Sequence, residues 1–211
     1  MEKNTKARIS REALKLFARK GYMATSMSDI AKELNLTKAA LYKHYTSKQE
    51  ILDSIVARMR EGDKEQAEAY EMPEGTRKEM PGAYREVPME AICRFTGAMF
   101  RYWTEEEFPS CFRRMLTLEQ YHDPEMAAMY QNYLADGPVG YMTDIFRQTA
   151  GSEEAARQMA LEFYGPVFLL YSVYDGAEDK ESVKERLDRY LEWFSRSHRN
   201  LSPEADPAKT I

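Results

Sequence analysis

The spacing of apolar residues near the start of the chain predicts a series of short amphipathic helices. Over residues 5–20, apolar side chains recur at i, i+4, i+7 and i+8, which places them on one side of a helix. Gly21 then supplies a stop signal. Similar spacing predicts a helix over 27–34, another after residue 37, and a long one over 47–70. Because a mean helix is about 11–12 residues long, two consecutive short helices need a reason beyond stability.

Residues that favour helix starts stand at the expected places in this region. Ser26, Thr37 and Ser47 each precede a predicted helix, and their oxygens accept hydrogen bonds from the unpaired amides of a first turn. Asn35 follows the second helix, and asparagine tolerates the left-handed conformation of a tight turn. Residues 25–52 are therefore expected to hold two short helices, a turn between them, and the start of a long helix.

Beyond residue 70 the pattern changes to longer and more apolar helices. A segment rich in Pro and Gly, 71–88, separates them from the N-terminal helices. The predicted helices cover about residues 89–103, 109–121, a segment from 124 that is broken at 136–140, 152–174, and a last helix that includes 183–194. The sequence therefore predicts an all-α fold.

The composition fits this helical interpretation. The 211 residues are 43% hydrophobic and 31% charged and include only 10 Gly, which suits a soluble helical protein and argues against a β-rich fold. Cys93 and Cys111 are expected to be reduced thiols, with a redox-sensing pair as the alternative. The charged start of the chain resembles no signal peptide, and no apolar run approaches the ~20 residues that cross a bilayer. We therefore expect a cytoplasmic protein with no membrane partner.

The charge of the chain is unevenly distributed. Residues 1–50 contain 11 Lys and Arg against 5 Asp and Glu, a net charge of +6, whereas the remaining residues carry a net charge of −11. A basic segment on an acidic body indicates a polyanionic partner for that segment. An ordinary solvated lysine surface is the alternative.

The two short helices and the helix that braces them have the geometry of a helix-turn-helix, whose second helix inserts its N-terminal end into a DNA major groove. If Leu41 and Tyr45 point to the core, the opposite side of that helix faces outward. The outward residues are then Lys38, Ala39, Tyr42, Lys43 and, at the edge, His44. Spacing alone leaves open a three-helix packing unit that binds no DNA.

Three motifs add a family resemblance to this geometry. The run from Ala7 to Leu52 contains "REALKLFARKGY", "TSMSDIA" and "LYKHYTSK", and in these motifs it resembles the DNA-binding domain of the TetR family of transcriptional regulators. The resemblance covers about a quarter of the chain by motif and the rest by architecture only. It implies an all-helical homodimer that binds a palindromic operator in double-stranded DNA and is released by a small-molecule effector.

The resemblance also implies roles for individual residues. Phosphate contacts are expected from Thr25, Ser26, Tyr42, His44 and Lys48, base-edge contacts from Lys38, Ala39 and Ala40, and further contacts from Thr37 and Lys43. The sequence departs from the family pattern at the turn, where Asn35 replaces the usual glycine, and at Ala39, which is followed by a second alanine. Two methyl groups can contact a thymine methyl but make no hydrogen bonds. Recognition of the operator sequence is therefore expected to depend on Lys38, Thr37 and DNA shape.

The predicted organisation is a helix-turn-helix domain at 1–50, a helical effector-binding and dimerisation domain at 51–201, and a disordered tail at 202–211. The second domain is rich in Met and aromatic residues, most of which build a core while some suit a deformable apolar pocket. The predicted contacts to an apolar or aromatic effector are Phe100, Trp103, Met115, Glu119, Tyr133, Phe168 and Tyr171. The predicted dimer contacts are Ala156, Ala160, Tyr164, Val167, Val183, Leu187, Leu191 and Phe194, on the last two helices.

Other classes of function find less support. The sequence has no Ser-His-Asp order, glycine-rich phosphate loop or HExxH motif, so no enzyme and no cofactor is predicted. His122, Asp123 and Glu125 are close in sequence, but Asp123 is expected to cap a helix, so no metal site is predicted. The alternative to a repressor is a small-molecule-binding or enzymatic helical protein whose N-terminal unit is only structural. In the repressor interpretation, the long helix from residue 47 links effector binding to DNA binding.

Overall fold

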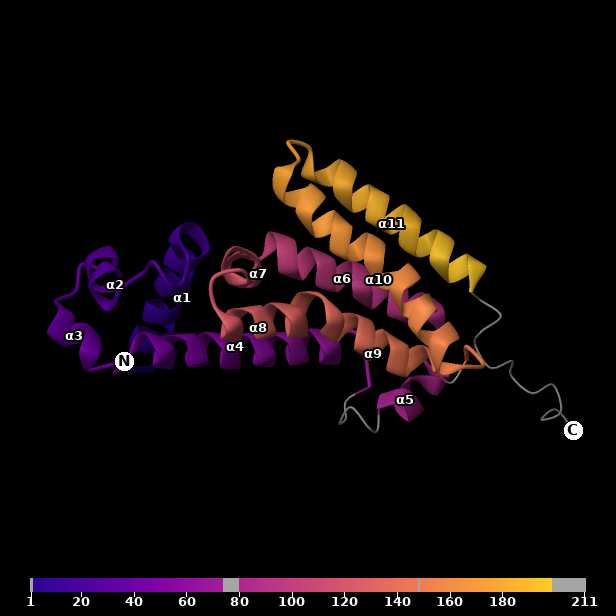
Figure 1. Ribbon diagram of the computed structural model, residues 1–211, viewed down its shortest axis with the longest axis horizontal. Helices are drawn as coiled ribbons and strands as arrows, with labels where there is room; N and C mark the ends of the chain where they lie inside the picture. The colour runs from indigo at the N-terminus through magenta and orange to yellow at the C-terminus, as the bar shows by residue number, and fades with distance from the viewer. Residues whose placement is uncertain (1, 74–79, 148, 199–211) are drawn as a thin grey trace, which may run out of the picture. The chain divides into compact units, whose positions relative to one another are not determined.

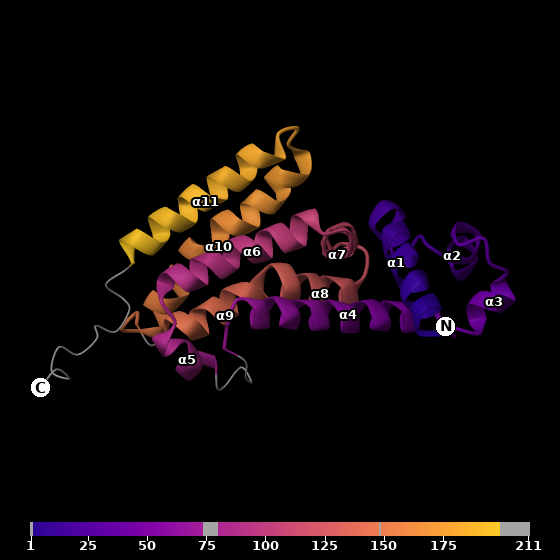
Figure 2. The same ribbon diagram turned by 180° about the vertical axis from the view of Figure 1, so that it is seen from behind.

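The computed structural model describes residues 2–73, 80–147 and 149–198, and all regular elements within these ranges are helices (Figure 1, and Figure 2 from behind). The all-α prediction is confirmed. The N-terminal helices are α1 (Glu2–Lys20), α2 (Met27–Glu33), α3 (Lys38–Tyr42) and α4 (Lys48–Ala69). They are followed by α5 (Met80–Ala83), a 3-10 turn (Tyr84–Glu86), α6 (Met89–Glu105), α7 (Glu107–Glu119), α8 (Pro124–Leu134), α9 (Asp136–Phe146), α10 (Glu153–Gly176) and α11 (Lys180–Ser197). The predicted tail at 202–211 and part of the predicted break at 71–88 lie outside the described residues.

Polar side chains begin the helices as the sequence predicts. Ser26 and Asp29 form a reciprocal capping box at the start of α2, and the Thr37 hydroxyl accepts a hydrogen bond from the Ala40 amide at 3.1 Å. The helix break predicted at 136–140 lies just before those residues, at Ala135: α8 ends at Leu134, and residues 136–140 form the start of α9. These boundaries depend on local chemistry, which the sequence displays directly.

The helices form two compact units, each built from separate parts of the chain. Unit 1 lies within Met1–Glu65 and Glu105–Gln131, and unit 2 within Gln66–Thr104 and Asn132–Ile211. These units differ from the segments 1–50 and 51–201 that the sequence suggests, because residues 105–131 group with the N-terminal helices. The functional boundaries at residues 50 and 201 stay a prediction.

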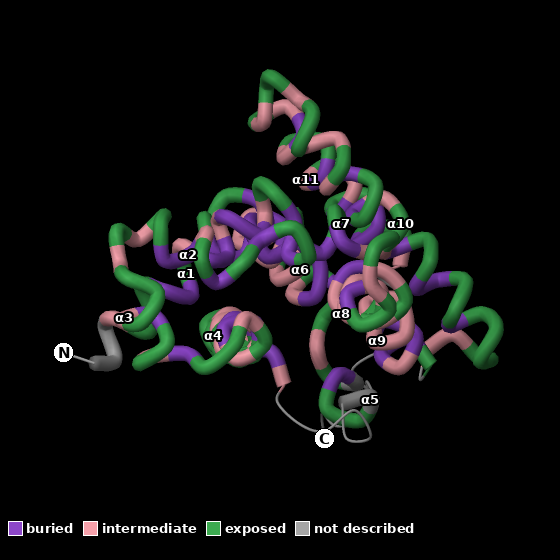
Figure 3. Tube along the Cα trace, turned by 60° about the vertical axis from the view of Figure 1, so that its left-hand side comes forward, coloured by how far each residue is buried: buried purple, intermediate pink, exposed green. Residues whose placement is uncertain are grey.

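Unit 1 combines the helix-turn-helix with a helix from the middle of the chain. α1 packs against α7 and α2, and α2 packs against α3. Lys15 of α1 forms an ion pair with Glu107 at 3.0 Å, at the first turn of α7. Buried and exposed positions alternate along the helices, as Figure 3 shows for the residues that carry a burial colour. The fully buried side chains of this unit include Ile9, Leu14, Phe17, Ile30, Leu41, Ile51 and Phe112.

Unit 2 is organised around α10, which packs against α9 and α11. Phe163 of α10 lies at the centre of an aromatic cluster, with ring centroids 5.7 Å from Phe146 and 4.9 Å from Phe194. The expectation that α11 exposes its apolar residues is wrong. Val183, Leu187, Leu191 and Phe194 are at most 4% exposed and belong to the core of unit 2.

A proline inside α10 leaves one backbone carbonyl without its helical donor. Pro166 has no amide hydrogen, so it cannot donate to the carbonyl of Glu162 four residues earlier. The hydroxyl of Tyr190 on α11 donates a hydrogen bond to that carbonyl and lies 3.1 Å from the carbonyl oxygen of Phe163. Tyr190 therefore replaces the missing amide and joins the two helices.

None of the helices in the described part of the chain is both long and apolar enough to cross a membrane.

Candidate nucleic-acid interface

The turn between α2 and α3 adopts the tight geometry that a helix-turn-helix requires. Asn35 has a φ of 53°, in the left-handed region, and so takes the place of the glycine usual at such turns. The amide of Leu36 donates to the carbonyl of Ala31 at 2.8 Å, which closes the end of α2. Thr37 then caps α3. The departure at Asn35 therefore leaves the turn intact.

The side chains of α3 divide into a buried and an exposed face. Leu41 is fully buried and Tyr45, just after the helix, is 2% exposed, as predicted. The exposed side chains on and beside α3 are Thr37, Lys38, Ala39, Tyr42 and Lys43. Tyr42 is one of the large apolar side chains of the described residues that remain exposed, at 43%. An exposed face with two lysines and a tyrosine suits contact with a polyanion.

Ala40 and His44 occupy less open positions on this helix. Both are partly buried, and the Nδ1 atom of His44 is buried without a hydrogen-bond partner. The His44 amide donates to the carbonyl of Leu41 at 2.9 Å, which ends the helix. These positions leave the predicted DNA contacts of Ala40 and His44 less accessible than those of Lys38 or Tyr42.

The two residues predicted to meet phosphate at the start of α2 differ in accessibility. Ser26 is exposed, whereas Thr25 is only 1% exposed and its hydroxyl donates to the carbonyl of Gly21 at 2.7 Å. The Thr25 side chain thus stabilises the turn between α1 and α2, and its predicted phosphate contact does not fit this burial. The signal that sequence reasoning missed is Gly21, whose turn leaves a carbonyl in need of a donor.

Lys48, at the start of α4, is turned toward the same loop. Its Nζ donates to the carbonyl of Tyr22 at 2.6 Å, lies 3.5 Å from the carbonyl of Met23, and sits 4.2 Å from the centre of the Tyr22 ring. Burial lowers the pKa of Lys48, and the Glu119 carboxylate acts in the opposite direction. The predicted phosphate contact is therefore a partly buried cation that already has backbone acceptors.

The predicted effector contacts are divided between the two units. In unit 2, Phe100 stacks on Tyr171 with ring centroids 4.9 Å apart, and Trp103 lies 6.1 Å from Tyr133. Phe168 is 40% exposed and contacts Tyr164 at 6.4 Å, on the outer side of α10. The remaining two, Met115 and Glu119, are buried residues of α7 in unit 1. The structure thus brings together Phe100 with Tyr171 and Trp103 with Tyr133.

The predicted dimer contacts on α10 and α11 are mostly interior residues. Ala156, Ala160 and Val167 are at most 2% exposed, and Tyr164 is partly buried with its hydroxyl donated to the carbonyl of Leu134 at 2.9 Å. The large apolar side chains that remain exposed on these two helices are Leu161, Phe168, Leu169 and Trp193. The predicted dimer contacts are thus mostly covered within the single chain, because an apolar stripe predicts coverage without saying which surface provides it.

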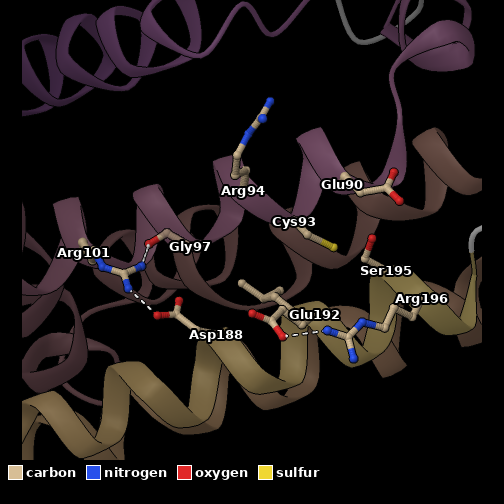
Figure 4. Close-up of a pocket in the computed structure, with 10 residues that line it drawn as sticks. Glu90, Cys93, Arg94, Gly97, Arg101, Asp188, Glu192, Ser195 and Arg196 are labelled. Atoms are coloured by element: carbon tan, nitrogen blue, oxygen red, sulfur yellow. Dashed lines mark hydrogen bonds and ion pairs between the residues drawn. The ribbon is translucent and has the colours of Figure 1, made fainter.

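A groove between α6 and α11 was not predicted from the sequence. It has a volume of about 460 Å³, and its lining includes Cys93, Gly97 and Ser195. Figure 4 shows Arg101 bound to the Gly97 carbonyl and to Asp188, the latter at 2.6 Å, and Arg196 paired with Glu192, while Arg94 extends away from α11. Two of the cations that line the groove are therefore already engaged by carboxylates.

The cysteines and acidic residues give little sign of redox or metal chemistry. Burial raises the pKa of the Cys93 thiol to about 12 and also raises the pKa of Cys111, so both favour the unreactive thiol form. Across the parts of the chain that the structure describes, no group of three or more His, Cys, Asp or Glu is arranged to hold a metal ion. Asp123 accepts hydrogen bonds from the amides of Glu125 and Met126, as a helix cap does.

Comparison with known proteins gives matches over the same N-terminal helices. Residues 9–55 match the sequence profile described as "Bacterial regulatory proteins, tetR family". The segment is 48% identical over 46 residues to the biofilm operon icaADBC HTH-type negative transcriptional regulator IcaR of Staphylococcus epidermidis, and 45% identical over 51 residues to that of Staphylococcus aureus strain Newman. These matches cover 22% and 24% of this chain, and only about a quarter of the length of either relative, 25% and 27%.

Solved structures match over nearly the whole chain. The TetR family transcriptional regulator PfmR from Thermus thermophilus is 28% identical, with a TM-score of 0.58, over 90% of this chain and 94% of that one. A transcriptional regulator from Aquifex aeolicus is 20% identical, with a TM-score of 0.62 over 90% and 98% of the two chains, and supports the fold alone. The likeness therefore extends from the helix-turn-helix to the helices that follow it.

Proposed function

We propose that the chain is a DNA-binding transcriptional repressor of the tetR family, controlled by a small molecule. Membership of a family of regulators agrees with the prediction that the chain is not an enzyme. The observation that carries the proposal is the exposed face of α3, where Lys38, Tyr42 and Lys43 surround two small alanines beside a correctly formed turn. Repression in particular is suggested by IcaR, which is described as a negative transcriptional regulator.

In this proposal the α3 face enters the major groove of an operator in the cytoplasm. Lys38 would contact base edges through its ammonium group, whereas Ala39 and Ala40 allow close approach to the groove floor. Phosphates on either side would be contacted by Ser26, Tyr42, Lys43 and Lys48, and the net charge of +6 in residues 1–50 would attract the DNA. Phosphate contacts supply affinity, and the few base contacts supply preference.

The proposed assembly is a two-fold dimer formed by the outer faces of α10 and α11. Leu161, Phe168, Leu169 and Trp193 are between 40% and 61% exposed, which is costly for large apolar side chains grouped on two adjacent helices. A two-fold axis would pair each patch with its own copy and bury both. A dimer would also present two α3 helices to the two halves of a palindromic operator, whose centres lie about 34–36 Å apart or a multiple of this.

The proposed effector is a small, largely apolar or aromatic molecule that binds among the aromatic residues of unit 2. Phe100, Tyr171, Trp103 and Tyr133 form ring contacts in this unit, and tyrosine adds a hydroxyl that can orient a ligand. An effector that binds between these rings would push them apart and so favour a conformation different from the DNA-bound one. We propose, as the sequence suggests, that α4 carries this change to the helix-turn-helix.

The experiment that tests the proposal is recovery of bound genomic fragments followed by anisotropy titration on the recovered duplex. Tyr42→Ala combined with Lys48→Ala should weaken binding to all duplexes and lower the salt slope, because both changes remove phosphate contacts. Tyr121→Ala with Arg114→Ala is the matched control, since Tyr121 is 85% exposed and Arg114 is exposed on α7, outside α3 and outside the proposed dimer helices. Equal binding by the wild type and the Tyr42, Lys48 variant would refute the proposed interface.

A further inference from the structure

A buried carboxylate lies in unit 1 without the partners that such a group normally has. Glu119, the last residue of α7, is 3% exposed, and its Oε2 atom is buried with no hydrogen-bond partner. A buried polar atom without a hydrogen bond costs free energy in general, so a protein that keeps one usually gains something from the group that carries it. The surroundings of Glu119 indicate what that gain is.

The carboxylate occupies a space that exists only because residue 21 is glycine. Gly21 has a φ of 90°, and a Cβ atom placed on it would lie 2.2 Å from Oε1 of Glu119. The tip of α7 therefore fits closely against the turn between α1 and α2. The same turn carries the carbonyls of Gly21, Tyr22 and Met23 that accept from Thr25 and Lys48.

Lys48 is held on the same turn that the Glu119 carboxylate meets. Its Nζ is held on the turn by the Tyr22 carbonyl at 2.6 Å and by the face of the Tyr22 ring. The Glu119 charge raises the pKa of Lys48 against the lowering effect of burial, so the two groups interact electrostatically. The pKa of Tyr22 is raised to about 12 by burial and by Glu125, Asp53 and Asp123, so the surroundings of the turn are acidic.

We propose that Glu119 is an intramolecular counter-ion that holds the Lys48 ammonium on the α1–α2 turn and thereby limits the affinity of the protein for DNA phosphate. The inference rests on the proposed function, in which Lys48 contacts phosphate, and adds to it a residue of α7 that opposes the contact. A phosphate that approaches Lys48 meets a cation already neutralised in part, and it also meets the negative charge of Glu119 itself. Both effects oppose binding, so removal of the carboxylate charge strengthens it.

The first test needs no DNA. The pKa of the Lys48 ammonium is measured by NMR of ¹⁵N-labelled lysine side chains in the wild type, Glu119→Gln and Glu107→Gln. Glutamine keeps the size of the side chain and removes its charge, so Glu119→Gln lowers the pKa of Lys48. Glu107→Gln removes a charge from the other end of α7, where Glu107 pairs with Lys15, and leaves the pKa of Lys48 unchanged. An unchanged pKa of Lys48 in Glu119→Gln overturns the proposal.

The second test measures affinity for the operator at pH 7 and low salt. Glu119→Gln binds about fivefold more tightly than the wild type, as expected for loss of one unfavourable charge near a phosphate contact. In a Lys48→Ala background the same substitution changes the affinity less than about twofold, because its main target is gone. A gain of equal size in both backgrounds, or in Glu107→Gln, indicates a general charge effect and overturns the proposal.

The two tests separate failure of this inference from failure of the proposed function. If no DNA fragment binds to the wild type, the proposed function fails, and with it the proposal that Glu119 limits DNA affinity. The NMR titration still decides whether Glu119 and Lys48 form a charge pair. Thermal unfolding checks that each variant is folded. Glu119→Met, similar in length and without charge, replaces Glu119→Gln if the glutamine variant does not fold, with the same expected results.

Discussion

The hydroxyl of Tyr190 on α11 donates a hydrogen bond to the carbonyl of Glu162 on α10, the carbonyl that Pro166 leaves without a helical donor. A helix that contains proline loses the hydrogen bond to the carbonyl four residues earlier, and it usually kinks for this reason. In this protein a side chain from the neighbouring helix supplies the donor. The same bond fixes the position of α11 along α10.

Loss of this bond is expected to lower the stability of the protein. Tyr190→Phe keeps the ring contacts with Trp193 and Phe194 and removes only the donor. We expect a decrease of about 0.5–1.5 kcal/mol in the free energy of unfolding, the net value of one hydrogen bond, because the Glu162 carbonyl loses its donor. Urea titration followed by circular dichroism measures the change. Tyr121→Phe, at a tyrosine that is 85% exposed, should change stability by less than about 0.5 kcal/mol.

The conformation of Gly21 predicts a large cost for a single added methyl group. Gly21→Ala combines a φ of 90° with a Cβ atom 2.2 Å from the Glu119 carboxylate. We expect destabilisation of more than about 1 kcal/mol, mainly because alanine is strained at positive φ, with a smaller part because the Glu119 carboxylate must shift. When Glu119→Ala is combined with Gly21→Ala, only the part of the lost stability that is due to the clash should be recovered. Full recovery would show that the backbone conformation contributes nothing.

The capping box of α2 predicts a measurable pKa difference. Hydrogen bonds from the hydroxyl and the amide of Ser26 lower the pKa of Asp29 below its usual value. A carboxyl with a lower pKa in the folded state adds stability above its unfolded pKa, near ~3.9, and this contribution is lost as the pH falls below that value. Ser26→Ala should therefore raise the pKa of Asp29 in an NMR titration and reduce the loss of stability in acid. Thr37→Ala, at the cap of α3, should leave the Asp29 value unchanged.

The exposed patch on α10 and α11 predicts the oligomeric state. Leu169→Glu and Trp193→Glu each place a charge on a side chain that is about 60% exposed in the single chain, so the monomer should fold normally. If the patch is a dimer interface, the charge becomes buried in the dimer, and light scattering at micromolar concentration should show monomers. Leu118→Glu, at an exposed leucine on α7, is the control and should remain dimeric. If the wild type is monomeric, both the proposed interface and the proposed palindromic operator are wrong.

Lys38 is expected to affect sequence preference more than overall affinity. It lies exposed at the first position of α3, the end that would enter the groove. Lys38→Ala should relax preference at one or two operator positions, at a cost of about 1–3 kcal/mol for the preferred base. A binding-site selection on randomised duplexes measures this. A uniform loss of affinity across all DNA sequences would instead indicate that Lys38 contacts phosphate.

The sequence predicted those parts of the fold that depend on neighbouring residues. Ser26, Thr37 and Asn35 act within a few positions of themselves, so the boundaries of α2 and α3 follow from composition alone. The exposed and buried faces of α3 follow from helical periodicity in the same way. The exposed face of α3, which is proposed to contact DNA, could therefore largely be predicted from the sequence.

Contacts between distant parts of the chain left no such signal. Nothing near Gly21 in sequence indicates that Glu119 will fill the space beside it, and Thr25 looks like an exposed cap until Gly21 is seen to need a donor. The stripe of Leu187 and Phe194 was correctly identified as one that must be covered, but periodicity does not distinguish a neighbour in the same chain from one in another. Tertiary packing decided each of these positions.

The division of the chain into interleaved units has a practical consequence for chimeric regulators. The backbone passes between the two units three times, at residues 65–66, 104–105 and 131–132, and α7 is joined to α6 through Glu106 alone. A graft that transfers only residues 1–50 onto a different sensor would strip α1 of the helix it packs against and leave Gly21 facing a foreign side chain. A change of DNA specificity in this protein should therefore be limited to the exposed residues of α3. Its own α1 and α7 should be kept together.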